Sequence, residues 1–156
     1  MITKKIAQGA IIAAIYIILT VILAPISYGP IQVRVAEALT LLPFWFGISA
    51  AVALWLGVMV ANIFGGLGAI DIFGGSLITL VAGILTAKSP NIYVGTLPPV
   101  ILNAFGVAGI LYFVLNLPHY WPLVLYVGIG QTIAVILIGI PLMKFLVKRL
   151  DKFLKI

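Results

Sequence analysis

The sequence predicts an all-α integral membrane protein in which six transmembrane helices form a bundle. Of its 156 residues, 64% are hydrophobic and only 8% are charged, and the mean hydropathy is +1.33. The apolar runs also have the length of membrane spans, which need about 20 residues to cross about 30 Å of hydrocarbon. Because no polar stretch is long enough for a soluble domain, we expect a single transmembrane domain over residues 1–156.

Three apolar runs have the full length of a span: Ile6 to Ile26, Leu97 to Leu117 and Pro122 to Met143. A fourth and shorter run extends from Ile72 to Ala87. We expect each of these four runs to form a helix that crosses the membrane.

The run from Val35 to Phe64 is too long for one upright helix and too short for two full ones. Pro43 and Gly47 predict a break inside it, because proline ends a helix and glycine permits a sharp turn. We therefore expect a short helix from about Ala36 to Phe46 and a second one from about Gly47 to Phe64. With the other four runs, this makes six spans.

Basic residues gather at both ends of the chain, at Lys4 and Lys5 and again from Lys144 to Lys155. Positively charged segments stay on the cytoplasmic side of a membrane. We therefore expect a multi-pass protein of the cell (plasma) membrane with both termini in the cytoplasm, which requires an even number of spans. Four spans are the alternative, if Ile72 to Ala87 is re-entrant. The position of the basic residues at both ends of the chain explains the net charge of +6 by the orientation of the protein in the lipid bilayer. We therefore expect no nucleic acid as a partner.

The short second helix predicts a pocket. At 1.5 Å per residue it is only about 16 Å long and cannot fill its share of the bilayer. Either the segment from Pro25 to Val35 folds inward above it, or that segment caps a water-filled cavity, since non-helical backbone at such depth is tolerated only beside protein or water. We expect a pocket that opens to the outside.

Glu37 and Arg34 lie where this short helix begins, at the edge of a long uncharged run. Charges in such a place are costly unless something uses them. The two oxygens of Glu37 suit a ligand with two adjacent N–H donors, such as the edge of guanine. The alternatives are an ion pair between the two side chains, a carboxylate at the helix N-terminus, or an arginine that reaches the membrane surface.

The glycine-rich connection around Asp71 is a second candidate region. Asp71 either caps the helix that follows or contacts a ligand. Tyr28, Trp55 and Phe73 are candidates for stacking on a flat ring, with packing or anchoring at the interface as the alternative.

Asn103 and Gln131 are amides within otherwise apolar spans. An amide offers a donor and an acceptor side by side, which can read the edge of a heterocycle. Hydrogen bonding between helices explains such residues equally well. For Asn62, which lies nearer a span end, we favour this structural role.

The first span carries small residues on one helical face, at Ala7, Ala10 and Ala14, with Gly9 and Ala13 beside them. Small residues let another helix approach closely. That helix belongs either to the same bundle or to a separate membrane subunit.

The sequence does not favour an enzyme. It contains no cysteine, and therefore no thiolate nucleophile or thiolate metal site. The single histidine, His119, sits in a short turn with no obvious catalytic or metal-binding partner. The glycines near Asp71 match neither a phosphate loop nor a dinucleotide fingerprint. We expect no catalytic residues, no metal and no cofactor.

The chain resembles the QueT group of substrate-binding S-components from energy-coupling factor (ECF) transporters, which are associated with queuosine precursors. The strongest part of the resemblance is Val33-Arg-Val-Ala-Glu-Ala-Leu-Thr-Leu-Leu-Pro43, with Tyr28-Gly-Pro-Ile-Gln32 just before it. Shorter matches surround Asp71, Asn103 and Gln131.

The resemblance implies six helices around an outward-facing pocket for a deazaguanine base such as preQ1, preQ0 or queuine. Gln32 joins the other candidate substrate-binding residues on this basis. It also implies an Ala-x-x-x-Ala docking face, matched by Ala10 and Ala14 with Ala7 and Ala13 beside them. The implied partners are a transmembrane coupling subunit, against which the loaded S-component tilts, and two cytoplasmic ATPases.

One departure concerns selectivity, because many relatives carry an acid where this chain has Gln131. If that acid meets an aminomethyl cation, glutamine predicts that a neutral or weakly basic deazaguanine binds at least as well as the aminomethyl form. Two other functions stay open: an S-component for a different vitamin or nucleobase, and a membrane assembly protein without a transport role.

Overall fold

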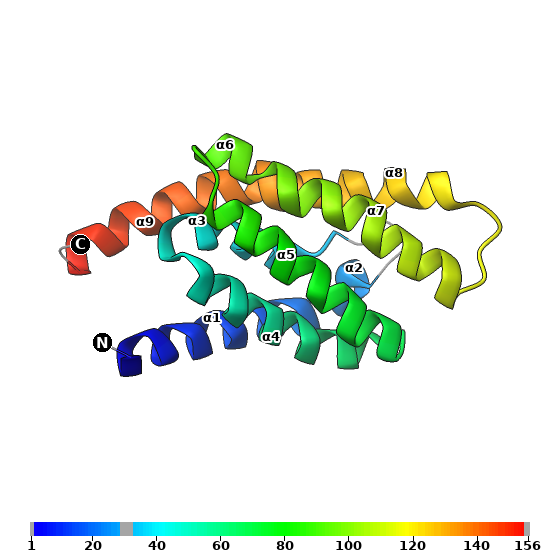
Figure 1. The fold of residues 1–156 in the computed structure, drawn as a ribbon, viewed down its shortest axis with the longest axis horizontal. Helices are drawn as coiled ribbons and strands as arrows, with labels where there is room; N and C mark the ends of the chain where they lie inside the picture. The colour runs from blue at the N-terminus through cyan, green and yellow to red at the C-terminus, as the bar shows by residue number, and fades with distance from the viewer. Residues whose placement is uncertain (1, 29–32, 155–156) are drawn as a thin grey trace.

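The structure is a computed structural model that describes residues 2–28 and 33–154. Helices follow one another along the described chain (Figure 1). Their bounds are α1 (Ile2–Ile22), α2 (Ala24–Ser27), η1 (Val35–Leu41), α3 (Pro43–Phe46), α4 (Ile48–Gly65), η2 (Ile70–Gly75), α5 (Ser76–Ala87), α6 (Ile92–Gly95), α7 (Leu97–Val114), α8 (Tyr120–Gln131), η3 (Thr132–Gly139) and α9 (Ile140–Leu154). The all-α membrane bundle expected from the sequence is therefore confirmed.

Five helical segments in the described chain are long and apolar enough to cross a membrane. They are Lys5–Ile22, Ile48–Gly65, Ile70–Ala87, Ile92–Val114 and Tyr120–Arg149. A shorter apolar helical segment covers Val35–Phe46. A total of six crossings stays a prediction, because it depends on whether this short segment counts as one.

The break in the middle of the chain lies where the sequence placed it. Pro43 begins α3, and Gly47 separates α3 from α4 with a φ of 70°, a value that glycine adopts without steric cost. A second break, which we did not expect, divides the first span: α1 ends at Ile22, and Pro25 lies in the first turn of α2. Proline is favoured at such a helix start because its missing N–H needs no partner there.

The short second helix differs from the expected α-helix. Its first part, η1, is a 3₁₀ helix of seven residues, in which Glu37 N donates to Arg34 O at 2.8 Å. A 3₁₀ helix rises about 2.0 Å per residue, so η1 covers about 14 Å before α3 begins. Its reach along the bundle therefore stays short.

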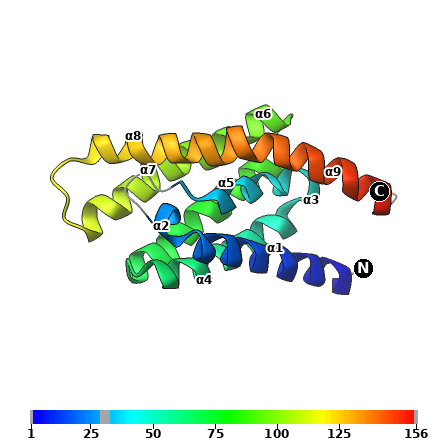
Figure 2. The same cartoon turned by 180° about the vertical axis from the view of Figure 1, so that it is seen from behind.

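The helices lie roughly along one long axis, and the chain begins and ends at the same end of the bundle (Figures 1 and 2). The connection between α7 and α8 lies at the opposite end. This arrangement agrees with an even number of crossings. Which end faces the cytoplasm stays a prediction from the basic residues.

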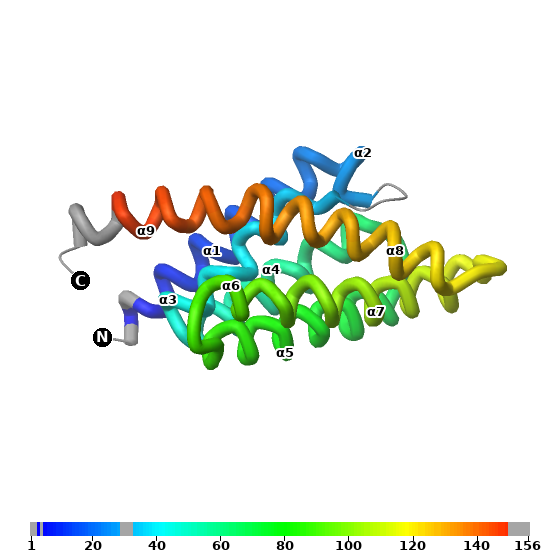
Figure 3. The backbone as a smooth tube through the Cα atoms, turned by 90° about the horizontal axis from the view of Figure 1, so that it is seen from above, coloured from blue at the N-terminus to red at the C-terminus, as the bar shows by residue number. Residues whose placement is uncertain are grey.

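The element η1 lies inside the bundle, where it packs against α1, α5, η3 and α9 (Figure 3). Small side chains make this possible: Ala36 and Ala38 are buried, and Gly139 of η3 leaves room for the η1 backbone. A Cβ at Gly139 would lie 3.3 Å from Ala38 Cα, closer than ordinary packing. Close backbone approach thus holds η1, with its single charged residue Glu37, inside the bundle.

Candidate functional site

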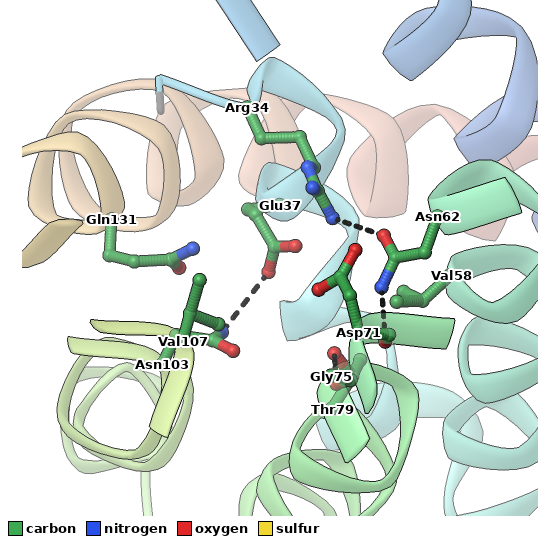
Figure 4. Close-up of a pocket in the computed structure, with 10 residues that line it drawn as sticks. All are labelled: Arg34, Glu37, Val58, Asn62, Asp71, Gly75, Thr79, Asn103, Val107 and Gln131. Carbon is green, nitrogen blue, oxygen red and sulfur yellow. Dashed lines mark hydrogen bonds between the residues drawn. The ribbon is translucent and has the colours of Figure 1, made fainter. Parts of the chain in front are cut away.

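A cavity of about 10 Å³ lies at the centre of the bundle (Figure 4). Side chains from η1, α4, η2, α5, α7 and α8 converge on it. Its lining consists of Arg34, Glu37, Val58, Asn62, Asp71, Gly75, Thr79, Asn103, Val107 and Gln131. Charged and amide side chains are rare inside a membrane bundle, and here six of them meet in one place. We call this site the polar cavity.

Glu37 is the central acid of the polar cavity and is 2% exposed. The hydroxyl of Tyr16, from α1, donates to Oε1 of Glu37. From the other side, Asn103 Nδ2 donates to Oε2 at 3.4 Å, which is long for a hydrogen bond. Each carboxylate oxygen therefore has one donor, and the Asn103 contact is the weaker of the two.

Arg34 and Asn62 form a second set of contacts. Arg34 Nη1 donates to Asn62 Oδ1 at 3.0 Å, and Asn62 Nδ2 donates to the backbone oxygen of Asp71 at 2.9 Å. The amide thereby joins η1, α4 and η2. No ion pair between Arg34 and Glu37, the alternative raised from the sequence, is present among the described residues. Arg34 reaches α4 instead.

Two acceptor atoms in the polar cavity have no hydrogen-bond partner in the described structure: Asp71 Oδ2 and Gln131 Oε1. Both side chains are buried, at 3% and 5% exposed. Figure 4 shows them on opposite sides of Glu37. A buried polar atom without a partner costs about 1–3 kcal/mol, so the two oxygens are strong candidates for contacts with a ligand.

Gly75 gives the Asp71 carboxylate its space. A Cβ at this position would lie 2.9 Å from Asp71 Oδ1 and 2.9 Å from Asn62 Nδ2. Gly75 and Asp71 both belong to η2, a π-helical turn, and such turns occur frequently at functional sites. A second π-helical segment, η3, begins directly after Gln131.

The sequence anticipated five members of this site, namely Glu37, Arg34, Asp71, Asn103 and Gln131. The structure brings all five into one lining. Asn62, for which we favoured a structural role, both bridges helices and lines the cavity. Whether these residues bind a substrate stays a prediction.

Tyr16 is a member of the site that was not predicted from the sequence; it is fully buried and bonded to Glu37. One signal was present: a phenolic hydroxyl in an apolar span normally needs a hydrogen-bond partner when it is buried. The sequence does not say which partner, because Tyr16 and Glu37 lie 21 positions apart.

The stacking candidates lie outside the cavity lining. Phe73 is 63% exposed; it lies two residues after Asp71 and therefore points to the opposite side of the helix. Tyr28 is an anchor: its hydroxyl donates to Ala61 O at 2.6 Å, and its ring lies 5.4 Å from the Arg34 guanidinium. Trp55 is not part of the lining either. Gln32 lies outside the described residues.

The alanine face of α1 is divided. Ala7, Ala10 and Ala14 are exposed, as a docking surface requires. Ala13 turns toward α4, where a Cβ at Gly57 would lie 3.1 Å from its Cα. Ala13 therefore serves the close packing of α1 on α4, and the surface open to a partner consists of the other three alanines.

A second and larger hollow lies toward the end of the bundle where α1 begins. Its volume is about 430 Å³. It is lined by Lys5, Gln8, Gly9, Ile11, Ile12, Ile15, Leu39, Leu42, Phe46, Ser49, Ala50 and Leu146. Most of these side chains are apolar, so we call this hollow the apolar groove.

Fold and site together define a class of protein. Apolar spans surround a buried cluster of one guanidinium, two carboxylates and three amides, and ionisable groups at such depth mark the pathways and binding sites of membrane transporters. The chain belongs to the QueT transporter family, whose model matches residues 6–148. It is a multi-pass membrane protein.

One relative supports the same family. The "Queuosine precursor transporter QueT" of Lactococcus lactis subsp. cremoris (strain MG1363) is 43% identical over 81 residues, which are 51% of this chain. The match covers 47% of the relative, or about half of its length. No solved structure matches the chain.

Proposed function

We propose that this chain is the substrate-capture subunit, or S-component, of an ECF transporter and that it binds a deazaguanine precursor of queuosine. The family membership supports transport, and the name of the Lactococcus lactis relative, a queuosine precursor transporter, supports the substrate. The observation that carries the proposal is the buried Glu37 carboxylate at the centre of the polar cavity. The site is not built for catalysis in this proposal; it captures the base.

Glu37 accepts hydrogen bonds from the two adjacent N–H groups at the guanine-like edge of the base. A carboxylate suits this edge because its two oxygens face two parallel donors. Asn103 and Gln131 orient the ring from α7 and α8, and Arg34 holds the start of η1 against α4 through Asn62. Tyr28 supports Arg34 from outside the cavity.

The polar cavity must enlarge to take a base. Its present volume of about 10 Å³ holds about one water molecule, whereas ligand pockets commonly measure about 300–1,000 Å³. The hydrogen bond from Asn103 to Glu37 is long, at 3.4 Å, so it is the contact to Glu37 that a bound base replaces most easily. The base then supplies Glu37 with the donor that Asn103 gives up.

Delivery of the base needs further subunits. In this proposal a transmembrane coupling subunit docks on Ala7, Ala10 and Ala14 of α1, and two cytoplasmic ATPases drive the tilting of the loaded protein. The exposure of these alanines supports this role, because small side chains allow close helix packing inside a membrane. Both termini face the cytoplasm.

The test is a calorimetric titration of the purified protein with preQ1, preQ0 and queuine. At least one base should bind, and Glu37→Gln should weaken binding by about 2 kcal/mol or more, about 30-fold. Asp151→Asn is the matched control, because Asp151 is the third acid of the chain and follows the last apolar run in the sequence, among the basic residues Lys148 to Lys155. It should bind like the wild type.

Three outcomes count against the proposal. Unchanged affinity in Glu37→Gln removes the central role of that residue. Binding of an unrelated vitamin or nucleobase, found by mass spectrometry of co-purified small molecules, supports an S-component of different specificity. A protein that binds no base and supports no uptake points to a role in membrane assembly.

A further inference from the structure

The charges that line the polar cavity do not balance. The whole chain has three acidic residues, and two of them, Glu37 and Asp71, line this cavity together with one cation, Arg34. All three are buried. A buried charge is costly unless a partner neutralises it, so an ionised site has one carboxylate in excess.

The hydrogen bonds identify which carboxylate is in excess. Glu37 receives donors from Tyr16 and Asn103. The amide nitrogen of Asn62, the neighbour of Asp71, donates to the Asp71 backbone oxygen, and Asp71 Oδ2 has no partner among the described residues. Asp71 is therefore the acid whose side chain the protein leaves incompletely satisfied.

The space around Asp71 is also arranged for its side chain. Gly75 leaves room where any Cβ would come within 2.9 Å of Asp71 Oδ1. Across the cavity, Gln131 Oε1 is a second acceptor without a partner. A buried carboxylate oxygen with no partner among the described residues, as Asp71 Oδ2 is, suits a group that carries several N–H donors and a positive charge, as an ammonium does.

We infer that Asp71 selects a substrate that carries an ammonium group, so that the protein prefers a cationic deazaguanine to a neutral one. This inference rests on the proposed function. It reverses the expectation drawn from Gln131 alone, because the acid that meets the cation belongs to η2 and does not stand at the position of Gln131.

The experiment compares two bases with the same ring: preQ1, which has an aminomethyl cation, and preQ0, which has a neutral nitrile. Their affinities are measured for the wild type, Asp71→Asn and the control Asp151→Asn. The wild type should bind preQ1 about 10-fold or more tightly than preQ0, the scale of a hydrogen bond to a charged group. Asp71→Asn should remove most of this preference by weakening preQ1 while preQ0 stays within about threefold.

The outcomes separate the inference from the proposed function. If wild-type protein binds both bases but prefers preQ0, or if Asp71→Asn weakens both equally, the selectivity role of Asp71 is wrong and the proposed function stands. If neither base binds, the proposed function fails and the inference fails with it. The wild-type preference needs no variant, and Asp71→Ser offers the same comparison should Asp71→Asn not fold.

Discussion

The polar cavity is small and lined by polar groups, whereas the apolar groove is large and mostly apolar. The cavity measures about 10 Å³ and is surrounded by charged and amide side chains, whereas the groove measures about 430 Å³ and is lined mostly by aliphatic ones. Volume alone would select the groove. Specific recognition depends on a few fixed polar groups, and these are in the cavity.

The same chemistry explains the two sizes. In the cavity, Tyr16, Asn103 and Asn62 bond to neighbouring polar groups and draw η1, α4 and α7 together. Isoleucines on α1 provide no such directional contacts in the groove. A small cavity held by hydrogen bonds that a ligand can replace is therefore a better candidate binding site than a large hollow lined mostly by aliphatic side chains.

The largest effect should come from variants of the exposed alanine face of α1. In the proposed function this face serves delivery of the base and not its capture. In Ala10→Trp/Ala14→Trp, two indole rings cover the exposed alanine face of α1 and block close approach of another helix. Uptake of the base into cells that contain the partner subunits should fall to background. Binding by the purified variant should match that of the wild type, because neither alanine lines the cavity. Retained uptake would contradict the docking role.

A pair of glycine variants compares the two hollows directly. In Gly75→Ala, the new methyl group lies 2.9 Å from Asn62 Nδ2 and Asp71 Oδ1 and must displace both. We expect base affinity to fall by about 100-fold, equivalent to about 2.7 kcal/mol.

The matched control is Gly9→Ala in the apolar groove, where the nearest atom to the new methyl group is Ala53 Cβ at 3.5 Å. This is an ordinary packing distance, so affinity should not change. Equal losses in the two variants, measured by titration, would remove the distinction between the hollows.

Tyr16→Phe tests how the cavity positions its central acid. The substitution keeps the ring in the core and removes the hydroxyl that donates to Glu37. Loss of one donor to a buried carboxylate should weaken base binding by about 10-fold, within the usual range of about 1–3 kcal/mol. Tighter binding would show instead that Tyr16 competes with the base for Glu37.

The smallest effect should come from the groove itself. Ile11→Ala and Ile15→Ala enlarge a hollow that is already open and leave the polar cavity unchanged. Base affinity should stay within about twofold, or about 0.4 kcal/mol. A loss as large as that of Tyr16→Phe, measured in the same titration, would mean that the groove takes part in capture.

Local signals in the sequence predicted much of the fold. Apolar length located the spans, and Pro43 and Gly47 located the break that makes the second helix short. The 3₁₀ form of η1 was missed because it depends on packing against η3, whose Gly139 lies about 100 positions from Ala38 in the chain. No local pattern carries that information.

For the site, too, local signals in the sequence predicted the residues but not their contacts. Five members of the site could be predicted because a charged or amide residue within an apolar run is visible in the sequence itself. They are Glu37, Arg34, Asp71, Asn103 and Gln131. Their partners could not be predicted, because Asn103 contacts Glu37 across 66 positions. The side that Asp71 and Phe73 face follows from the register of η2, which the sequence did not define.

The closed form of the polar cavity has a consequence for kinetics. If the empty site is closed most of the time, a base can enter only during brief openings, and its association rate levels off as its concentration rises. The apparent affinity is then the affinity of the open form multiplied by the fraction of molecules that are open. In the proposed function, closure also slows the escape of a bound base, so that a loaded protein has time to meet its coupling subunit in the membrane.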